Sequence, residues 1–144
     1  IFSEADEAVP FTFELTKDQA RQIKEKSGMR VRQRRISGFE MKRMGLTVGW
    51  AYVDDVIGKH EYITYAAGIG VKRAVRGVEI IEYRETWGFE IREPDWRAQF
   101  KGRTLEEPLK LGKDIENISG ATLSCRNVTD GVRRLLATHH VWRA

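Results

Sequence analysis

The sequence predicts an α+β fold, in which an antiparallel β-meander sheet packs with an N-terminal helix, a short middle helix and a long C-terminal helix. Strand-like segments follow one another through residues 30–83 with short connections, as in an antiparallel sheet. Helical periodicity is found before and after this region. The 144 residues contain no internal repeat and no linker, so we expect a single domain over residues 1–144.

The composition excludes several classes of protein. The chain is 41% hydrophobic and 32% charged with three prolines, which is typical of a folded domain rather than a disordered one. No segment approaches the roughly 20 apolar residues that a membrane-spanning helix needs. The single cysteine, Cys125, excludes an internal disulfide and a metal site built from cysteines. Without a Cys-x-x-Cys-His motif the chain does not attach a c-type haem.

The first helix is predicted from its two ends. Thr16 with Gln19 three residues later forms a capping-box pattern, so the helix should start near Lys17. Gly28 is suited to the position after the last turn. The apolar stripe of this helix is thin, and we therefore expect it to lie on the surface.

The sheet is predicted from segments rich in β-branched and aromatic residues, namely 47–53, 62–65 and 75–83. Glycines between and beside these segments indicate turns. The expected turns lie at Ser37-Gly38, Gly45, Gly58-Lys59 and Gly70.

A short middle helix is predicted over residues 94–100, with Pro94 in its first turn and Gly102 ending it. Trp96 and Phe100 share one face of this helix because they are four residues apart. Residues 104–118 are expected to form a loop with two short extended pieces.

The C-terminal helix has the clearest pattern. Apolar or small residues recur every three to four positions at Ala121, Cys125, Val128, Val132, Leu135, Leu136 and His139. Ser119 is the expected N-cap. Cys125 should be a buried small hydrophobe, and His139 with His140 should stabilise the C-terminal end of the helix rather than bind a metal.

The residues before this helix carry the chemistry. Ser119, Thr122 and Ser124 place three hydroxyls around Gly120 at the expected start of a strong helix. Free backbone N–H groups and the positive end of the helix dipole meet at such a point, which makes it suited to an anion. Spacing alone still favours an ordinary Ser-capped helix.

The sequence Ser-Gly-Ala-Thr-Leu-Ser at residues 119–124, preceded by Asp114, resembles the flavinylation motif of the FMN-binding domain family. This family includes the G subunit of the Rnf complex, the C subunit of the sodium-pumping NADH:quinone oxidoreductase and extracytoplasmic domains of respiratory regulators. The resemblance continues, in the family's order, at residues 4–6, 58–63, 78–85, 88–91 and 96–102. The central loop reads Glu-Thr-Trp-Gly-Phe-Glu at 85–90 where Rnf and Nqr subunits carry Glu-Thr-Pro-Gly-Leu-Gly, so it is closer to the regulator-like branch.

The resemblance implies that FMN is esterified through its phosphate to Thr122. A separate, magnesium-dependent flavin transferase makes this bond with FAD as donor, and it recognises Asp114. Ser119 and Ser124 are expected to donate hydrogen bonds to the phosphate. The remaining residues expected around the attachment point are Gly120, Ala121 and Leu123.

The resemblance also implies which residues lie beside the flavin ring. These are Glu85, Thr86, Trp87 and Gly88, with Trp87 or Phe89 shielding one face of the ring. An equally favoured interpretation makes Trp87 and Phe89 plain core aromatics.

The expected function is an electron-transfer flavoprotein domain outside the cytoplasm, periplasmic or at the outer face of the membrane, with membrane-bound redox partners. We expect no catalytic residue, no metal ligand and no substrate chemistry of its own, and a leader or anchor ahead of the given residues. The alternative is a redox-sensing domain of a larger membrane protein. The basic residues 30–35 are expected to form a solvated face, with an acidic redox partner or anionic lipid as alternative contacts. A nucleic-acid module is disfavoured because aromatics do not alternate with these arginines.

Overall fold

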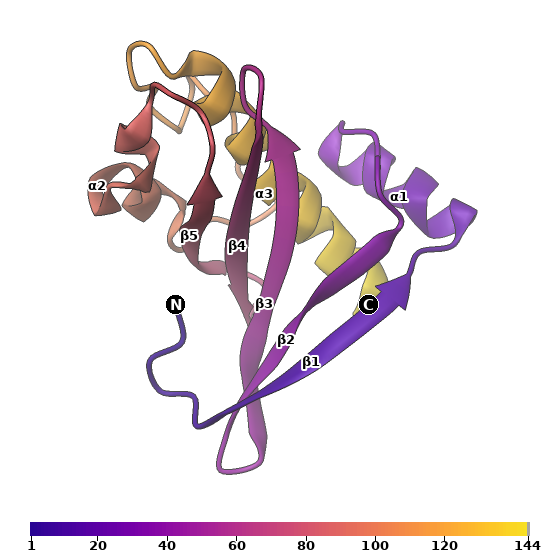
Figure 1. The fold of residues 1–144 in the computed structure, drawn as a ribbon. Helices are drawn as coiled ribbons and strands as arrows, with labels where there is room; N and C mark the ends of the chain where they lie inside the picture. The colour runs from indigo at the N-terminus through magenta and orange to yellow at the C-terminus, as the bar shows by residue number, and fades with distance from the viewer. Residues whose placement is uncertain (144) are drawn as a thin grey trace.

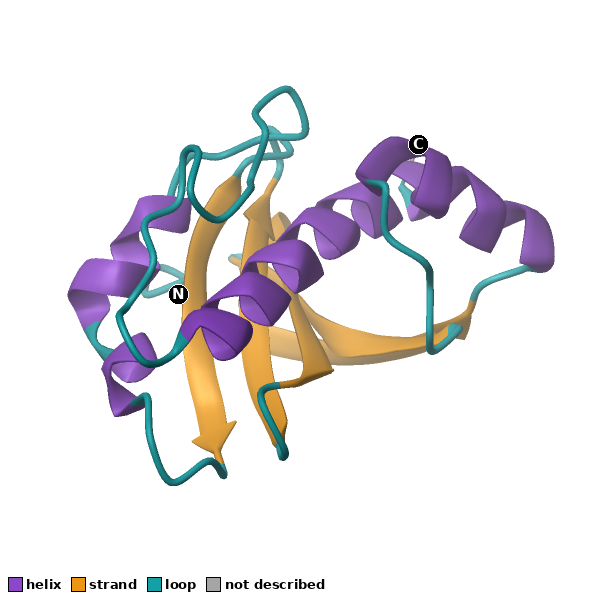
Figure 2. Ribbon diagram, turned by 90° about the horizontal axis from the view of Figure 1, so that it is seen from above, coloured by secondary structure: helices purple, strands orange, loops and turns teal. Residues whose placement is uncertain are grey.

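A five-stranded antiparallel sheet forms the centre of the structure, a computed structural model that describes residues 1–143. The strands lie in the order of the chain: β1 (Glu7–Glu14), β2 (Arg35–Arg43), β3 (Leu46–Ile57), β4 (Tyr62–Gly70) and β5 (Val75–Tyr83). The helices are α1 (Lys17–Ser27), α2 (Pro94–Arg97) and α3 (Thr122–Trp142), with 3₁₀ turns η1 (Phe89–Arg92) and η2 (Ala98–Phe100). Helix α3 crosses one face of the sheet, and α1 packs against α3 (Figures 1 and 2). The predicted α+β fold is confirmed. No helix among residues 1–143 is long and apolar enough to cross a bilayer.

Helix α1 has the predicted ends. The Thr16 hydroxyl accepts a hydrogen bond from the Gln19 N–H at 3.0 Å, while the Gln19 side chain accepts one from the Thr16 N–H at 2.9 Å. Gly28 follows the helix with a φ of 74°. The thin apolar stripe suffices for anchoring, because Ile23 is fully buried in a small cluster with Leu15 and with Ala137 of α3.

Two features of the sheet differ from the prediction. Strand β1 was not expected, and α1 separates it from its neighbour β2, so this part of the meander is not a hairpin. The predicted turn at Ser37-Gly38 is wrong, since both residues lie within β2. Gly38 is needed there for close packing: a Cβ atom would overlap the Ala51 carbonyl oxygen on β3 and lie 2.9 Å from the Phe11 ring.

The core lies between the sheet and α3, and every residue of the predicted apolar stripe of α3 is buried in it. The predicted middle helix is confirmed as α2 followed by η2. Trp96 and Phe100 pack edge to face with ring centroids 5.1 Å apart. The Trp96 indole N–H donates to the Glu116 carbonyl at 2.8 Å, which fixes the loop before α3 against this helix.

The predicted N-cap of α3 is wrong. The helix begins at Thr122, and Ala121 occupies the cap position without a side-chain hydrogen bond. A turn closed by the Ala121 N–H on the Ile118 carbonyl at 3.0 Å precedes it, with Gly120 at a φ of 86°. This turn holds Ser119 outside the helix, so its hydroxyl cannot cap the first N–H groups.

The expectation for His139 is also wrong. Its Nδ1 lies 2.6 Å from the Tyr52 hydroxyl inside the core, where burial lowers the pKa of His139 to about 4. The imidazole is therefore neutral near pH 7 and contributes no charge to the helix end. Burial and Arg73 also lower the pKa of the half-buried His140.

Candidate functional site

Thr122 lies at the first position of α3, where its side chain is half-buried and outside the hydrophobic core. Its hydroxyl oxygen accepts a hydrogen bond from the side-chain amide of the exposed Asn117 at 2.9 Å. The N–H groups of the first helical turn receive no side-chain cap. Such N–H groups, at the positive end of a helix of 21 residues, stabilise a bound anion.

The other residues of the motif divide between surface and interior. Ser119 and Gly120 are exposed in the turn before the helix, and Leu123 is 44% exposed. Ser124 is buried, and its hydroxyl lies 3.5 Å from that of Tyr83 on β5. Ser124 therefore joins the helix to the sheet, whereas Ser119 is free to contact a ligand.

The 85–88 loop is seated directly against the motif. Gly88 has a φ of 88°, and a Cβ atom there would lie 2.9 Å from the Cβ of Ala121 and 2.5 Å from the Tyr83 hydroxyl. The Tyr83 hydroxyl donates a hydrogen bond to the Trp87 carbonyl, which holds this turn of the loop in place. A glycine is needed here because the loop and the start of α3 approach so closely.

The aromatic side chains of this loop are exposed. Trp87 is 79% exposed and Phe89 is 55% exposed, so the interpretation of both as core aromatics is wrong. Phe89 packs edge to face on the Tyr83 ring at a centroid distance of 5.8 Å. Trp87 and Phe89 flank Gly88, which lies against Ala121, so exposed aromatic side chains come from the loop that meets the start of α3.

Glu85 joins the loop to the β3–β4 hairpin. One of its carboxylate oxygens accepts hydrogen bonds from the backbone N–H groups of His60 and Glu61, the latter at 2.6 Å, and these lower the pKa of Glu85. The same hairpin contacts α3, because a Cβ atom at Gly58 would lie 3.0 Å from the Ser124 hydroxyl. Thr86, the next residue in the sequence, is exposed.

Asp114 closes the loop that leads to the motif. Its carboxylate accepts hydrogen bonds from the N–H groups of Leu109 and Lys110, both at 2.9 Å, and lies 3.8 Å from Arg103. Burial acts to raise the pKa of Asp114, but the two N–H groups and Arg103 outweigh it and lower that pKa. The carboxylate is thus ionised and tied to its own loop.

Two residues at the site were given no role by the sequence. Asn117 contacts the Thr122 hydroxyl, and Tyr83 contacts both the 85–88 loop and Ser124. An asparagine five residues before a threonine matches no recognised pattern. The hydroxyl of Tyr83 is brought to the motif only by the position of β5 in the sheet.

The comparison with known families agrees with this geometry. The model of the FMN-binding domain family matches residues 58–137. The chain belongs to this family. The matched region of this FMN-binding domain starts at the β3–β4 hairpin and includes the 85–88 loop and the motif, so the contacts described above lie within it. A search of curated proteins finds no significant match. FMN is the cofactor of the domain.

The residues at the start of α3 fit FMN. The uncapped helix N–H groups and the Thr122 hydroxyl suit its phosphate, and the exposed Trp87 and Phe89 suit an apolar ring. Residues 1–143 contain no group of three or more His, Cys, Asp or Glu placed to hold a metal ion.

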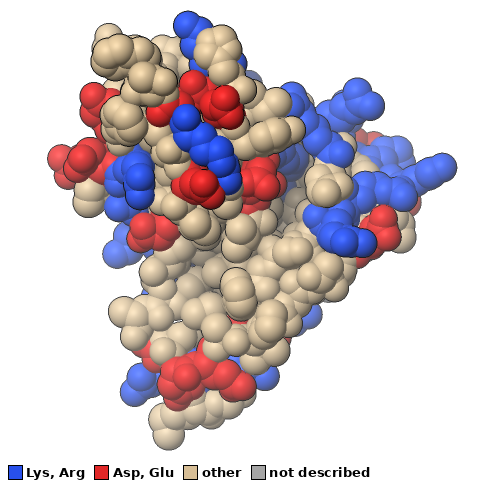
Figure 3. Space-filling view, viewed as in Figure 1, with Lys and Arg blue, Asp and Glu red and all other residues tan. Residues whose placement is uncertain are grey.

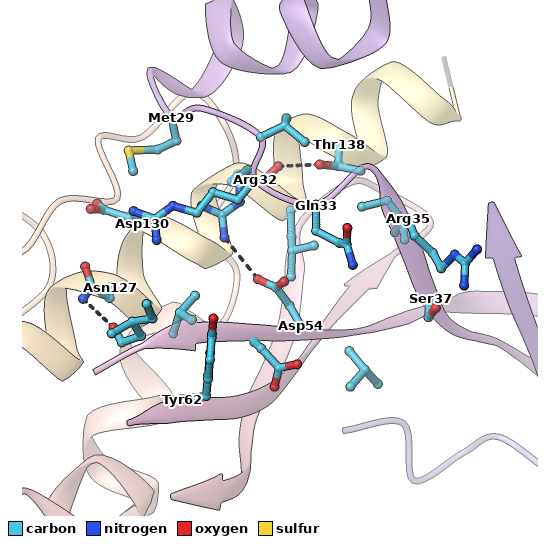
Figure 4. A pocket seen from close by; sticks show the side chains of 18 residues that line it. Met29, Arg32, Gln33, Arg35, Ser37, Asp54, Tyr62, Asn127, Asp130 and Thr138 are labelled. Atoms are coloured by element: carbon cyan, nitrogen blue, oxygen red, sulfur yellow. Dashed lines mark hydrogen bonds and ion pairs between the residues drawn. The ribbon is translucent and has the colours of Figure 1, made fainter. Parts of the chain in front are cut away.

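A separate groove of about 800 Å³ lies between β3, α3 and the chain segment before β2 (Figure 4). Helix α3 contributes Asn127, Asp130, Arg134 and Thr138 to this groove, and Thr122 is not among its lining residues. Thr122 lies about 140° around the helix from Asn127, at about 100° per residue. The FMN-binding domain therefore has two distinct surfaces, one at the motif and one along β3.

Proposed function

We propose that this FMN-binding domain is an electron-transfer module in which the FMN phosphate is esterified to the Thr122 hydroxyl. The observation that carries the proposal is the position of this hydroxyl, which lies outside the core at the uncapped start of α3 and within the family match. The flavin ring accepts and gives one or two electrons when bound. The chain itself holds the cofactor and has no substrate chemistry of its own.

The phosphate end is held by the start of α3. The free N–H groups of its first turn stabilise the negative charge that remains on a phosphodiester. The Asn117 amide keeps the Thr122 oxygen oriented, and the exposed Ser119 hydroxyl donates to the phosphate. Ser124 supports the helix from the opposite side through Tyr83.

The ring end lies over the 85–89 loop. Trp87 and Phe89 cover one face of the ring, while Glu85 keeps the loop attached to the β3–β4 hairpin. Gly88 allows the loop backbone to approach the motif. Thr86 and the backbone N–H groups of the loop stabilise negative charge at the pyrimidine edge of the ring.

The attachment requires a partner, which we propose to be a magnesium-dependent flavin transferase that uses FAD. The Thr122 oxygen bonds to the phosphorus of the FMN half, the pyrophosphate bond breaks, AMP leaves, and the hydroxyl proton is released. The turn at Ser119-Gly120 is exposed, so the transferase can reach the hydroxyl. We place the domain outside the cytoplasm with membrane-bound redox partners, where a covalent bond prevents loss of the cofactor by dilution.

Intact-protein mass spectrometry after co-expression with a flavin transferase tests the attachment. The wild-type chain should gain the mass of one FMN group, and Thr122→Val should not, although it keeps the shape of the side chain. Ser119→Ala and Ser124→Ala remove neighbouring hydroxyls and should keep the added mass. An unmodified wild-type chain, or a modified Thr122→Val, contradicts the proposal.

A further inference from the structure

The pairing between β3 and its neighbour β2 stops before either strand ends. The pairing of β2 with β3 runs from Arg43 opposite Leu46 to Ser37 opposite Val53. Beyond Val53, residues 54–57 of β3 pair with β4 alone. Arg35 and Ile36, the first two residues of β2, pair with β1 but not with β3, and the chain before them leads back to α1 (Figure 1). Four residues inside the sheet therefore have one open edge.

The hairpin shows which main-chain groups face this edge. The Gly58 N–H donates to the Glu61 carbonyl at 2.8 Å, so these two residues form a hydrogen-bonded pair. Hydrogen-bonded pairs alternate along an antiparallel ladder, and Asp54 and Val56 therefore bond to β4. Asp55 and Ile57 direct their N–H and C=O groups away from β4, into the groove.

Part of this edge is satisfied and part is open. The Asn127 side-chain amide donates to the Ile57 carbonyl at 2.5 Å. Within residues 1–143, no hydrogen bond outside the sheet is described for the Asp55 N–H, the Asp55 carbonyl or the Ile57 N–H. Unpaired strand edges of this kind pair readily with an added strand.

The groove has the shape that an added strand needs. Its volume of about 800 Å³ runs along residues 53–57, and α3 forms its floor. Met29, Val31 and Ile36 form the opposite wall, so the sides are partly apolar. Figure 3 shows this groove as a recess beside the basic side chains that gather near α1. Four strand residues span about 13 Å, which suits a short extended segment.

On the groove, two arginines without a described ion pair outnumber one carboxylate without one. Arg32 and Arg35 are exposed lining residues, and no ion pair is described for either within residues 1–143. Among the acidic lining residues, Asp54 is paired with Arg134 at 3.2 Å and bonded by the Tyr65 hydroxyl at 2.7 Å, and Asp130 is paired with Arg133 at 3.2 Å. Asp55 accepts a hydrogen bond from the neutral Thr64 hydroxyl and keeps its negative charge. An acidic ligand thus finds two unpaired guanidinium groups.

We propose that this groove binds an extended acidic segment of a partner protein, which adds as a strand to the open edge of β3. Its backbone pairs with Asp55 and Ile57, and its carboxylates contact Arg32 and Arg35. Strand β3 leads into the hairpin whose Gly58 contacts Ser124 next to the attachment residue, so the partner is held beside the cofactor end of the domain. The proposal does not depend on how FMN is attached.

Synthetic peptides test the pairing. An acetylated and amidated Glu-Val-Glu-Val-Glu-Val peptide should bind the intact chain at least tenfold more tightly than its lysine counterpart, as measured by calorimetry. The amide resonances of Asp55 and Ile57 should shift and gain protection from hydrogen exchange. Of two peptides N-methylated at either the glutamates or the valines, one should lose binding, because each set of N–H groups faces one edge of the strand. Equal binding by these two peptides overturns the proposal.

Variants of the chain test each half of the contact. Arg32→Glu and Arg35→Glu should each weaken the binding of the acidic peptide about tenfold. Arg30 is an exposed neighbour outside the groove, and Arg30→Glu should change the binding less than twofold. Ile57→Pro removes one N–H group from the open edge and should abolish binding, while Ile57→Ala should keep it. If the peptide variants bind alike and phosphatidylglycerol vesicles compete with them, the groove takes lipid headgroups and the proposal is wrong.

Discussion

The side-chain amide of Asn117 donates a hydrogen bond to the Thr122 hydroxyl oxygen at 2.9 Å. Asn117 belongs to the loop that Trp96 and Asp114 hold in place, through the Glu116 carbonyl and the N–H groups of residues 109 and 110. The orientation of Thr122, the proposed attachment residue, is thus set by a loop that is itself fixed to the core.

Replacing Asn117 should slow the attachment of FMN. One hydrogen bond contributes about 1 kcal/mol, so Asn117→Ala should reduce the rate about fivefold, and Asn117→Asp should do the same because it offers no donor. A time course of intact mass with purified flavin transferase and FAD measures this rate. Lys113→Ala, an exposed change in the same loop, is the control. A wild-type rate in both Asn117 variants would show that this contact does not position the hydroxyl.

Gly88→Ala should move the 85–88 loop off the motif. The added Cβ clashes with Ala121 and the Tyr83 hydroxyl, and the positive φ adds strain, so we expect a loss of about 2–3 kcal/mol in the free energy of unfolding. Gly102→Ala is the matched control, with a φ of 84° and nothing within 4 Å of the added atom. Urea unfolding measures both. Equal losses in the two variants would mean that the contact with the motif contributes nothing.

His139 should make the stability of the domain depend on pH. Its pKa is about 4 in the folded chain, against an ordinary value of 6.5 when unfolded, so the unfolded chain binds more protons between these values. The contribution of the neutral His139 to the free energy of unfolding is complete above pH 6.5. It is lost as the pH falls toward 4, and the total loss is about 3 kcal/mol. Urea unfolding at pH 7 and pH 4.5 measures the loss. His139→Gln should show a much smaller difference than the wild type. His140→Gln should reduce the difference less, because the pKa of this half-buried histidine is also lowered but its side chain lies outside the core.

Asp114→Asn should loosen the loop before α3. The neutral amide is a weaker acceptor for the N–H groups of Leu109 and Lys110, and we expect a loss of about 1 kcal/mol in the free energy of unfolding near pH 7. The pKa of Asp114 is lowered on folding, so its contribution is present above pH 3.8 and is lost as the pH falls below that value. The difference from the wild type should therefore shrink in acid. A separate measurement tests whether the transferase recognises this carboxylate: the intact mass of the folded variant shows whether FMN has been attached.

Much of the fold could be predicted because its signals are local. The caps of α1, the proline that starts α2 and the stripe of α3 each depend on residues a few positions apart. Strand β1 was missed because it is an edge strand, with only Val9, Phe11 and Phe13 half-buried and Pro10 between them. Gly38 was misread because its role is set by Ala51 on the next strand, which no local pattern reveals.

By itself the sequence determined the family, the cofactor and the helix on which Thr122 lies, because a motif and a periodicity are complete within a short stretch of chain. Only the tertiary structure decided that Ser119 stands outside the helix, that Asn117 holds the Thr122 hydroxyl and that Trp87 and Phe89 face outward. It also decided that the pairing of β2 with β3 stops at Val53 and leaves an open edge on β3. These properties arise where segments distant in the sequence meet, so they depend on how the sheet and α3 pack and not on the residues of any one segment.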